Sequence, residues 1–447
     1  MFRTPPTHAM SRAFTWLRPL LLVLVLGLLT ACGGDAPADD AADAGADDAE
    51  EATLRFAWWG SDVRHQMTQE VIDLYEEQNP HVTIDGEFLG FDDHWDNLAT
   101  QAAGGNTPDI IQHEERYLRE YAARGQLLNL DDHVEEIDTG EVDEGLLSTG
   151  QLAGGWYGVP FGLNVYALVA DPEGFWDAGV DMPDGTGWTW DEYADVAAEI
   201  TDGTDDGYYG GDEFGSIDAQ LQIFVRQHGH VGLYDVENDD LAFEPELLEE
   251  FWERRLDLID RGALPSADRL AEISDIDDSL LGTNQGATAF RWSNQLVALS
   301  ELSGRELELI GYPGETEFEQ PGTWFKSSQF LTASADTEHP DEAVRFIDFL
   351  TNDEEAARIL LGERGIPVNV GLRDEIVDDL TPADQKVVEY LDELEGQVSE
   401  PPPPPPAGAG EAQQTLMRLD DQVMFGQLTP SEATEQFFSE APNILGL

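Results

Sequence analysis

Hydrophobic positions between residues 54 and 125 switch repeatedly between a period of two and a period close to 3.6. Alternation predicts strands, and spacing over one helical face predicts helices. The strands are expected over 54–58, 82–88 and 108–112, and the helices around 67–75, 95–102 and 115–124. Such alternation of strands and helices is typical of an α/β domain with a largely parallel sheet.

Later segments continue this pattern. Thr189 and Glu192 form a predicted capping box before a helix over 193–200. Residues 161–170 are expected as one strand that crosses between domains. Further strands are expected at 287–290, 307–312 and 329–332, and further helices from Pro340 to Leu350 and from 352 to 361. Six prolines at 401–406 predict a stiff exposed segment, which we interpret as a loop insertion rather than a docking motif.

The N-terminus has the pattern of an export signal. Arg3, Arg12 and Arg18 precede an apolar run over 20–29, which is too short to span a bilayer. The residues Leu29-Thr30-Ala31-Cys32 then resemble a bacterial lipobox, after which the cysteine is lipidated and becomes the mature N-terminus. The alternative is an ordinary secretory signal that contains the chain's single cysteine. We therefore expect a signal peptide over 1–31 and an exported protein anchored at the outer face of the cell membrane, or in the periplasm.

Residues 32–52 contain many acidic and small residues and no large apolar side chain. Such a segment cannot bury enough surface to fold, so it predicts a disordered tether. The 447-residue chain is otherwise rich in apolar residues and contains 11 tryptophans. This composition predicts a globular protein of two domains.

The chain is extremely acidic, with 92 carboxylates, 22 basic residues and a formal net charge of -70. We interpret this surface as halophilic adaptation, because high salt screens self-repulsion to a few ångströms. Nucleic acid is excluded as a partner by the lack of a basic footprint. Anionic ligands and anionic lipid surfaces are disfavoured for the same reason, although a local arginine could override the average field.

Eight short stretches resemble one known family, in the same order along residues 53–445. They are Trp58-Trp59-Gly60, 95–101, 104–111, 125–130, 158–162, 188–192, 339–350 and Gly365-Ile366-Pro367-Val368-Asn369. The chain resembles the extracellular solute-binding proteins of ABC sugar importers, in the maltodextrin-binding-like group of family 1 lipoproteins.

The resemblance implies a type II periplasmic-binding-protein fold with two α/β lobes, a hinge and an interlobe cleft. We place the N-terminal lobe at 53–163 plus 326–376 and the C-terminal lobe at 164–325 plus 377–447. It also implies a monomer that is not an enzyme, uses no cofactor, and hands a carbohydrate to ABC permease subunits in the membrane. Membrane contact would come only through the lipid anchor and the permease.

Sugars offer hydroxyls and flat C–H faces, so a sugar site needs aromatic platforms together with carboxylates and amides. Alternation places Trp58 in the core and Trp59 toward the ligand, at the carboxyl end of the first strand. The resemblance implies the other candidate contacts, which are His113, Glu114, Glu115, Asn164, Tyr166, Trp292, Asn294 and Trp324. A solvated helix start or ordinary core packing is the alternative for each. Trp95 is equally suited to the core, and we interpret Arg364 as an anchor of its turn.

Two other patterns suggest metal binding. Residues 202–213 approach a twelve-residue calcium loop, but Thr204 departs from the usual third position. His228-Gly229-His230 lacks an identifiable third ligand. In so acidic a chain we interpret both as chance patterns and predict no metal site.

Other functions remain open at this point. The chain contains no G-x-S-x-G, H-E-x-x-H, P-loop or dinucleotide motif, which disfavours a tethered hydrolase. A surface adhesin would bind no small ligand. Within the binding class, the alternative to a sugar is another solute such as glycerol phosphate.

Overall fold

The computed structural model describes residues 51–446 except 153, 184–186, 213–216, 237–239, 274–275 and 319. These residues belong to one compact unit that begins at Glu50. The first strand starts at Ala52, one residue before the predicted start of the folded part. The signal peptide, Cys32 and the rest of the tether lie outside the described residues.

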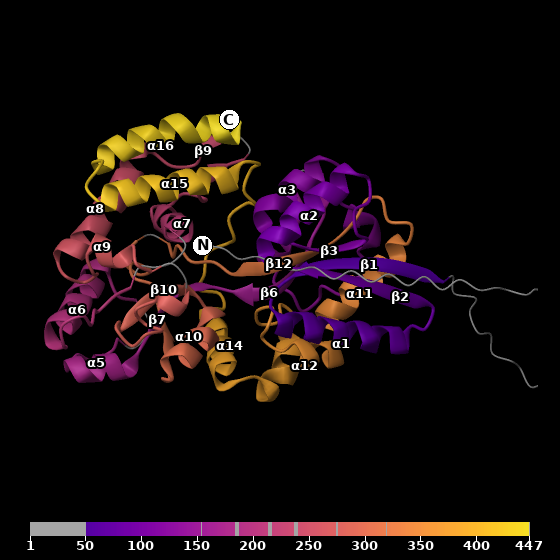
Figure 1. Ribbon diagram of the computed structural model, residues 1–447, viewed down its shortest axis with the longest axis horizontal. Helices are drawn as coiled ribbons and strands as arrows, with labels where there is room; N and C mark the ends of the chain where they lie inside the picture. Colours follow the sequence, from indigo (N-terminus) through magenta and orange to yellow (C-terminus); the bar gives the residue numbers. More distant parts are fainter. Residues whose placement is uncertain are drawn as a thin grey trace, which may run out of the picture. The chain divides into compact units, whose positions relative to one another are not determined.

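The first half of the fold is built on a five-stranded mixed sheet (Figure 1). Its order is β2 (Val82–Leu89), β1 (Ala52–Trp59), β3 (Ile110–His113), β12 (Lys326–Ala333) and β6 (Val159–Asn164). Its helices are α1 (Asp62–Gln78), α2 (Phe91–Ala103), α3 (Glu115–Ala123), α11 (Pro340–Asn352) and α12 (Glu354–Leu360). We call this sheet with its helices the five-stranded half.

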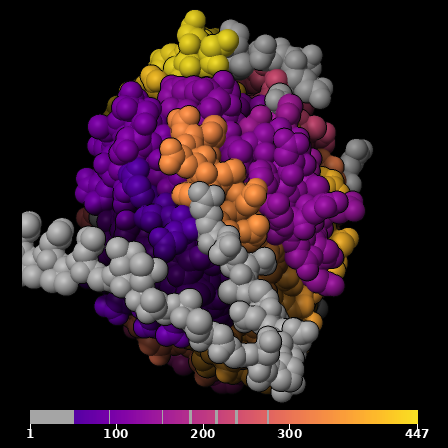
Figure 2. All heavy atoms as spheres, turned by 90° about the vertical axis from the view of Figure 1, so that its right-hand side faces the viewer, coloured from indigo at the N-terminus to yellow at the C-terminus, as the bar shows by residue number. Residues whose placement is uncertain are grey.

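Strand β12 is inserted into this sheet from far along the chain. It pairs antiparallel with both β3 and β6, whereas β1 pairs parallel with β2 and β3. Figure 2 shows orange surface from the later part of the chain between the indigo and magenta surfaces of earlier parts. The prediction of a largely parallel sheet is therefore right for four strands, and β12 is the exception.

The side chains of β1 divide between the two faces of the sheet, as alternation requires. Leu54, Phe56 and Trp58 pack in a core with α1, α11 and α12. Trp59 lies on the opposite face with α2 and α3. The predicted core position of Trp58 is confirmed. Trp95 also packs in the second of these cores.

The second half carries a three-stranded antiparallel sheet (Figure 1). Its order is β10 (Thr288–Trp292), β7 (Tyr166–Ala170) and β11 (Glu308–Ile310). Its helices are α5 (Pro172–Ala178), α6 (Trp190–Gly203), α7 (Ile217–Gln227), α8 (Pro245–Asp260), α10 (Gln295–Ser303), α14 (Pro382–Leu394), α15 (Ala409–Met424) and α16 (Pro430–Leu445). We call this the three-stranded half.

Smaller elements complete the described chain. They are the paired strands β4 (Gln151–Leu152) with β5 (Gly155–Trp156) and β8 (Tyr234–Asp235) with β9 (Asp240–Leu241), and the helices α4 (Glu144–Ser148), α9 (Ala267–Leu270) and α13 (Val370–Ile376). The capping box of Thr189 and Glu192 is confirmed. No helix in the described part of the chain has the length and apolar character that crossing a bilayer requires.

The predicted single strand over 161–170 is wrong. Val165 separates β6 from β7, and the two strands belong to different sheets. The Val165 amide donates to Ser293 Oγ and the Ser293 amide donates to the Val165 carbonyl, so the break is held by polar contacts. Around it, a hydrophobic cluster that includes Leu163, Ile366 and Val387 packs the two halves together.

Candidate functional site

A pocket of about 450 Å³ lies between the two halves, which is within the usual range of about 300–1,000 Å³ for small-molecule sites. The five-stranded half contributes Trp59, Arg64, Glu114, Glu115, Arg116, Asn164, Lys326, Ser328, Gln329 and Arg364. Facing them are Asp218, Ala219, Gln222, Leu233, Tyr234, Trp292, Asn294, Gln295, Trp324, Pro402, Pro403, Pro405, Ala409 and Gln413. A ligand in this space would touch both halves.

Sheet topology explains why the lining residues of the five-stranded half meet at one edge. Trp59 ends β1, Glu114 follows β3 and Asn164 ends β6. These are the carboxyl ends of strands that run in one direction, where ligands of α/β sheets gather. Because β12 runs the opposite way, its first residue Lys326 pairs with Asn164 at the same edge.

The aromatic part of the pocket is contributed mainly by the three-stranded half. Trp292 and Trp324 meet edge to face, with ring centroids 6.1 Å apart and an interplanar angle of 83°. Trp292 is half-buried, and Lys326 Nζ lies 5.7 Å from its ring centroid. Such rings can stack on the apolar face of a sugar.

Two ion pairs lie among the pocket residues of the five-stranded half. Lys326 Nζ lies 3.2 Å from Glu115 Oε2, and Arg116 Nε lies 2.9 Å from Glu114 Oε2. Burial raises the pKa of Glu115 above its ordinary value, although Lys326 opposes the shift. Burial alone would lower the pKa of Lys326, but Glu115 and Glu114 raise it, so the ammonium stays charged.

Two residues of the pocket lining each have a buried side-chain oxygen that lacks a hydrogen-bond donor among the described residues. Asn164 Oδ1 and Asp218 Oδ1 are buried and accept no hydrogen bond from the described residues. Burial also raises the pKa of Asp218, against the opposing effect of Arg116. Buried polar atoms are normally hydrogen-bonded, so these two oxygens require donors from a ligand or from water. They belong to opposite halves of the fold.

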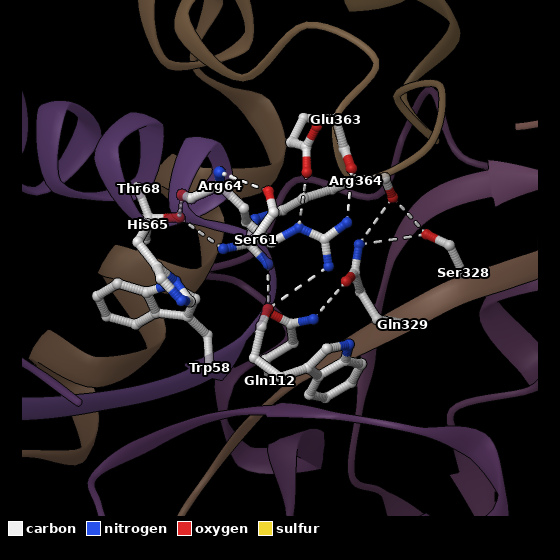
Figure 3. Close-up of polar contacts among 11 residues, drawn as sticks. Trp58, Ser61, Arg64, His65, Thr68, Gln112, Ser328, Gln329, Glu363 and Arg364 are labelled. Atoms are coloured by element: carbon white, nitrogen blue, oxygen red, sulfur yellow. Dashed lines mark hydrogen bonds and ion pairs between the residues drawn. The ribbon is translucent and has the colours of Figure 1, made fainter. Parts of the chain in front are cut away.

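A second polar network forms around Arg64 and Arg364 (Figure 3). Arg64 bonds Glu363 through Nε at 3.2 Å to Oε1 and through Nη2 at 2.7 Å to the carbonyl oxygen. Arg364 donates to Thr68 Oγ1 at 2.6 Å and also to Gln112 Oε1. Arg364 thus anchors its turn, as interpreted from the sequence, and also lines the pocket.

Gly162 allows the turn that contains Arg364 to approach β6. Its φ is +81°, and a Cβ atom there would lie 1.9 Å from the Arg364 carbonyl oxygen. We expect Gly162→Ala to lower the free energy of unfolding by about 3 kcal/mol or more, because backbone strain of about 1–2 kcal/mol adds to a steric overlap. Gly125→Ala is the matched control, since Gly125 has φ +69° and open space around it. Denaturant unfolding should show a much larger loss for Gly162→Ala, and equal losses would contradict the steric explanation.

The proline segment forms one wall of the pocket. Pro402, Pro403 and Pro405 line it, and Arg119 of α3 donates to the carbonyl oxygens of Pro404, at 2.9 Å from Nη2, and Pro405, at 3.2 Å from Nε. The segment contains no helix or strand, as expected of a loop, but its predicted exposure is wrong, because Pro402 and Pro404 are buried and only Pro403 is exposed. Its position at the pocket was not predicted, because nothing in the sequence indicates where a loop insertion folds back.

Seven of the nine residues predicted as ligand contacts line this one pocket, and two do not. His113 is fully buried and packs between Trp95 and Tyr121. Tyr166 is buried, donates to the Phe290 carbonyl oxygen at 3.2 Å and packs edge to face against Trp292. Both therefore support the pocket walls from within the core.

Sequence reasoning missed several pocket residues. They include Arg64, Asp218, Gln222, Tyr234, Lys326, Ser328, Gln329 and Gln413, besides the prolines. Arg64 could have been suspected, since it follows the turn after the first strand. The others carry no local signal, because tertiary packing alone brings α7, β12 and α15 to the pocket.

The described residues add no evidence for metal binding at the two sequence patterns, 202–213 and 228–230. His228 bonds the Phe224 carbonyl oxygen through Nδ1 at 2.8 Å and packs against Phe318. Glu213 of the possible calcium loop lies outside the described residues. Elsewhere, His133, Glu136 and Asp341 place ligand atoms within 4.8 Å of one another at the surface, a common arrangement of exposed acidic groups.

Residues 70–386 match the family described as bacterial extracellular solute-binding protein. A lipoprotein of Streptomyces antibioticus encoded in the oleD 5′ region is 27% identical, over 78% of this chain and 75% of the relative.

Among solved structures, a family 1 extracellular solute-binding protein of Alicyclobacillus acidocaldarius is 28% identical, with a TM-score of 0.74, 90% of this chain covered and 100% of the other. An oligogalacturonide-binding protein of Yersinia enterocolitica, in complex with saturated digalacturonic acid, is 24% identical, with a TM-score of 0.75. The match covers 89% of this chain and 99% of the other. The ABC substrate-binding protein of Listeria monocytogenes in complex with cycloalternan is 20% identical, with a TM-score of 0.73 and coverages of 89% and 100%.

The fold is the α/β fold of type II periplasmic solute-binding proteins, and the pocket lies between its two sheets. The chain belongs to the bacterial extracellular solute-binding protein family, whose members bind solutes for ABC transporters and are not enzymes. The expected family and fold class are thereby confirmed.

Proposed function

We propose that the protein captures a carbohydrate, an oligosaccharide, and delivers it to the permease of an ABC importer. The observation that carries this proposal is the pair of unpartnered acceptors, Asn164 Oδ1 and Asp218 Oδ1, on opposite halves of a pocket that also holds tryptophans. A sugar supplies hydroxyl donors for such oxygens and a C–H face for Trp292. The sugars bound to the Yersinia and Listeria relatives support the same class of ligand.

The predicted lobe bounds are 53–163 plus 326–376 and 164–325 plus 377–447. We assign the two halves to these lobes with one change, which places Asn164, the last residue of β6, in the first lobe. A ligand that touches both lobes binds the closed form more tightly and shifts the population toward it. The closed form then docks on the permease. The protein acts as a monomer and requires no cofactor in this mechanism.

A calorimetric screen of the mature protein in 2 M NaCl tests this function. Mono- and oligosaccharides, uronates, polyols and glycerol phosphate are the probes. We expect saturable binding of one sugar series, with a smaller radius of gyration in X-ray scattering when that sugar is added. Tight binding of glycerol phosphate with no response to any sugar would replace the carbohydrate by another solute. Binding without compaction would contradict the closure mechanism.

Lipid anchoring at Cys32 is the second part of the proposal. It rests on the lipobox-like residues and on the lipoprotein relative. We expect Cys32→Ser to move nearly all of the protein from the membrane fraction to the soluble exported fraction, because the lipid attaches through the thiol. Cell fractionation with immunoblotting measures this shift, and Ala38→Ser is the matched control within the tether. A Cys32→Ser protein that stays in the membrane fraction would contradict the anchor.

The acidic surface gives a further prediction. With 92 carboxylates and 22 basic residues, repulsion between surface charges opposes the compact state at low salt. We expect the melting temperature to rise by several degrees between 0.1 M and 2 M NaCl, because the screening length falls from about 10 Å to below 3 Å. Differential scanning calorimetry measures this rise. An unchanged melting temperature would count against halophilic adaptation.

A further inference from the structure

The pocket is far richer in cationic side chains than the chain as a whole. Carboxylates outnumber basic residues 92 to 22 in the sequence. The pocket instead contains more cationic side chains than carboxylates. The cations are Arg64, Arg116, Lys326 and Arg364, and the carboxylates are Glu114, Glu115 and Asp218. With Glu363, which pairs with Arg64, four carboxylates balance the four cations, so the pocket lacks the strong negative charge of the rest of the protein.

Ion pairing leaves one of these cations without a carboxylate. Arg116 pairs with Glu114, and Lys326 pairs with Glu115. Arg64 pairs with Glu363 at 3.2 Å. Arg364 forms an ion pair with no carboxylate of the described residues, and its hydrogen bonds go to the neutral oxygens of Gln112 and Thr68.

Arg364 is buried and lines the pocket, so its lack of a carboxylate partner bears on ligand binding. The side chain is 3% exposed, so water screens its charge poorly, and it contributes to the pocket wall. A buried charge without a counterion is destabilising. Burial and the neighbouring Arg64 both lower the pKa of Arg364 well below its ordinary value. A bound anion would supply the missing counterion and would raise the pKa of Arg364 toward its ordinary value.

The hydrogen bonds that Arg364 makes within the protein do not by themselves explain why a charged side chain is buried there. Arg226 is a buried arginine that does have a structural role, because it donates to the carbonyl oxygens of Gly322, Val231 and Glu400. Arg226 does not line the pocket. Arg364 instead donates to two neutral side-chain oxygens and lies near a second guanidinium, Arg64, whose carboxylate partner is Glu363 (Figure 3).

We propose that the carbohydrate is acidic, and that the Arg364 and Arg64 guanidinium groups bind the carboxylate of a uronic acid residue. This inference rests on the carbohydrate function proposed above and narrows its substrate class. A guanidinium presents paired N–H donors that match a carboxylate, which a neutral sugar lacks. Ser328 and Gln329 also line the pocket and position Arg364, because Ser328 Oγ and Gln329 Nε2 donate to its carbonyl oxygen.

Matched acid and ester ligands test the proposal with the unaltered mature protein. Glucuronate, galacturonate and digalacturonate are titrated against their methyl esters and against the corresponding neutral sugars. We expect at least one uronate to bind at least tenfold more tightly than its own methyl ester. Equal or tighter binding of the neutral partners would overturn this proposal and leave the carbohydrate function intact. Absence of binding by every sugar, acidic or neutral, would overturn both.

Substitutions then assign the preference to residues. We expect Arg364→Met to weaken uronate binding at least tenfold while changing ester binding less than threefold. Arg418→Met is the control, because Arg418 pairs with Glu440 outside the pocket. An undiminished acid preference in a folded Arg364→Met protein would overturn the assignment. If that variant does not fold, Arg364→Lys replaces it, with a smaller loss expected because lysine keeps the charge without the paired donors.

Discussion

Replacing Trp292 by alanine should weaken ligand binding by about thirtyfold, or about 2 kcal/mol, with little loss of stability. Trp292 is half-buried at the end of β10 and lines the pocket. Tyr166 packs against it edge to face, with centroids 5.0 Å apart at 74°, and Trp324 packs against it at 83°. These contacts fix the indole, so its free surface is pre-organised for a sugar face.

Titration calorimetry with the best ligand of the screen measures this loss. Trp292→Phe should retain most of the affinity, because a smaller ring still offers a stacking surface. Trp176→Ala is the matched control, since Trp176 is 83% exposed on α5 and does not line the pocket. Wild-type affinity in a folded Trp292→Ala protein would contradict the role of Trp292 as a sugar platform.

Acid should destabilise the fold through two buried histidines. Burial lowers the pKa of both His94 and His113 to about 4, from an ordinary value of 6.5. Below pH 6.5 the unfolded chain binds a proton at each histidine, whereas the folded protein does not until about pH 4. The stabilisation is therefore complete above pH 6.5 and is lost progressively as the pH falls toward 4. Each histidine should cost about 2 kcal/mol at pH 5.

Carboxylates also titrate as the pH falls. Comparing His113→Leu with the wild type separates the contribution of His113 from theirs. We expect the slope of unfolding free energy against pH, between pH 6 and 4.5, to fall by about 1.2 kcal/mol per unit in the variant. Leu118→Ala is the control, because it truncates the same core without removing a titratable group. It should lower stability equally at every pH. Parallel curves for His113→Leu and the wild type would contradict the lowered pKa.

The average charge of the chain is a poor guide to its pocket. A net charge of -70 argues against anionic ligands over the surface as a whole. The pocket lining, however, includes Arg64, Lys326 and Arg364 beside the carboxylates Glu114, Glu115 and Asp218. Nearby charges in a partly dry site outweigh distant screened ones, because the interaction grows with proximity and falling dielectric constant.

Local sequence pattern determined the elements of the five-stranded half. Its periodicity located β1, β2, β3 and the helices between them, since strands and helices bury their side chains with different periods. The same alternation separated Trp58 from Trp59 on β1. Family-like stretches then located the residues after each strand, and seven of nine candidates line one pocket.

Tertiary packing decided strand breaks, strand positions and side-chain burial that no local sequence pattern indicates. The break at Val165 depends on Ser293, and the position of Lys326 depends on the antiparallel pairing of β12 with β6. His113 has the local pattern of a ligand residue but is buried by Trp95 and Tyr121. Each outcome is set by partners far away in sequence. The sequence therefore determined the elements, the family and most candidate contacts, whereas only packing decided which side chains share the pocket and which charge remains unpaired in it.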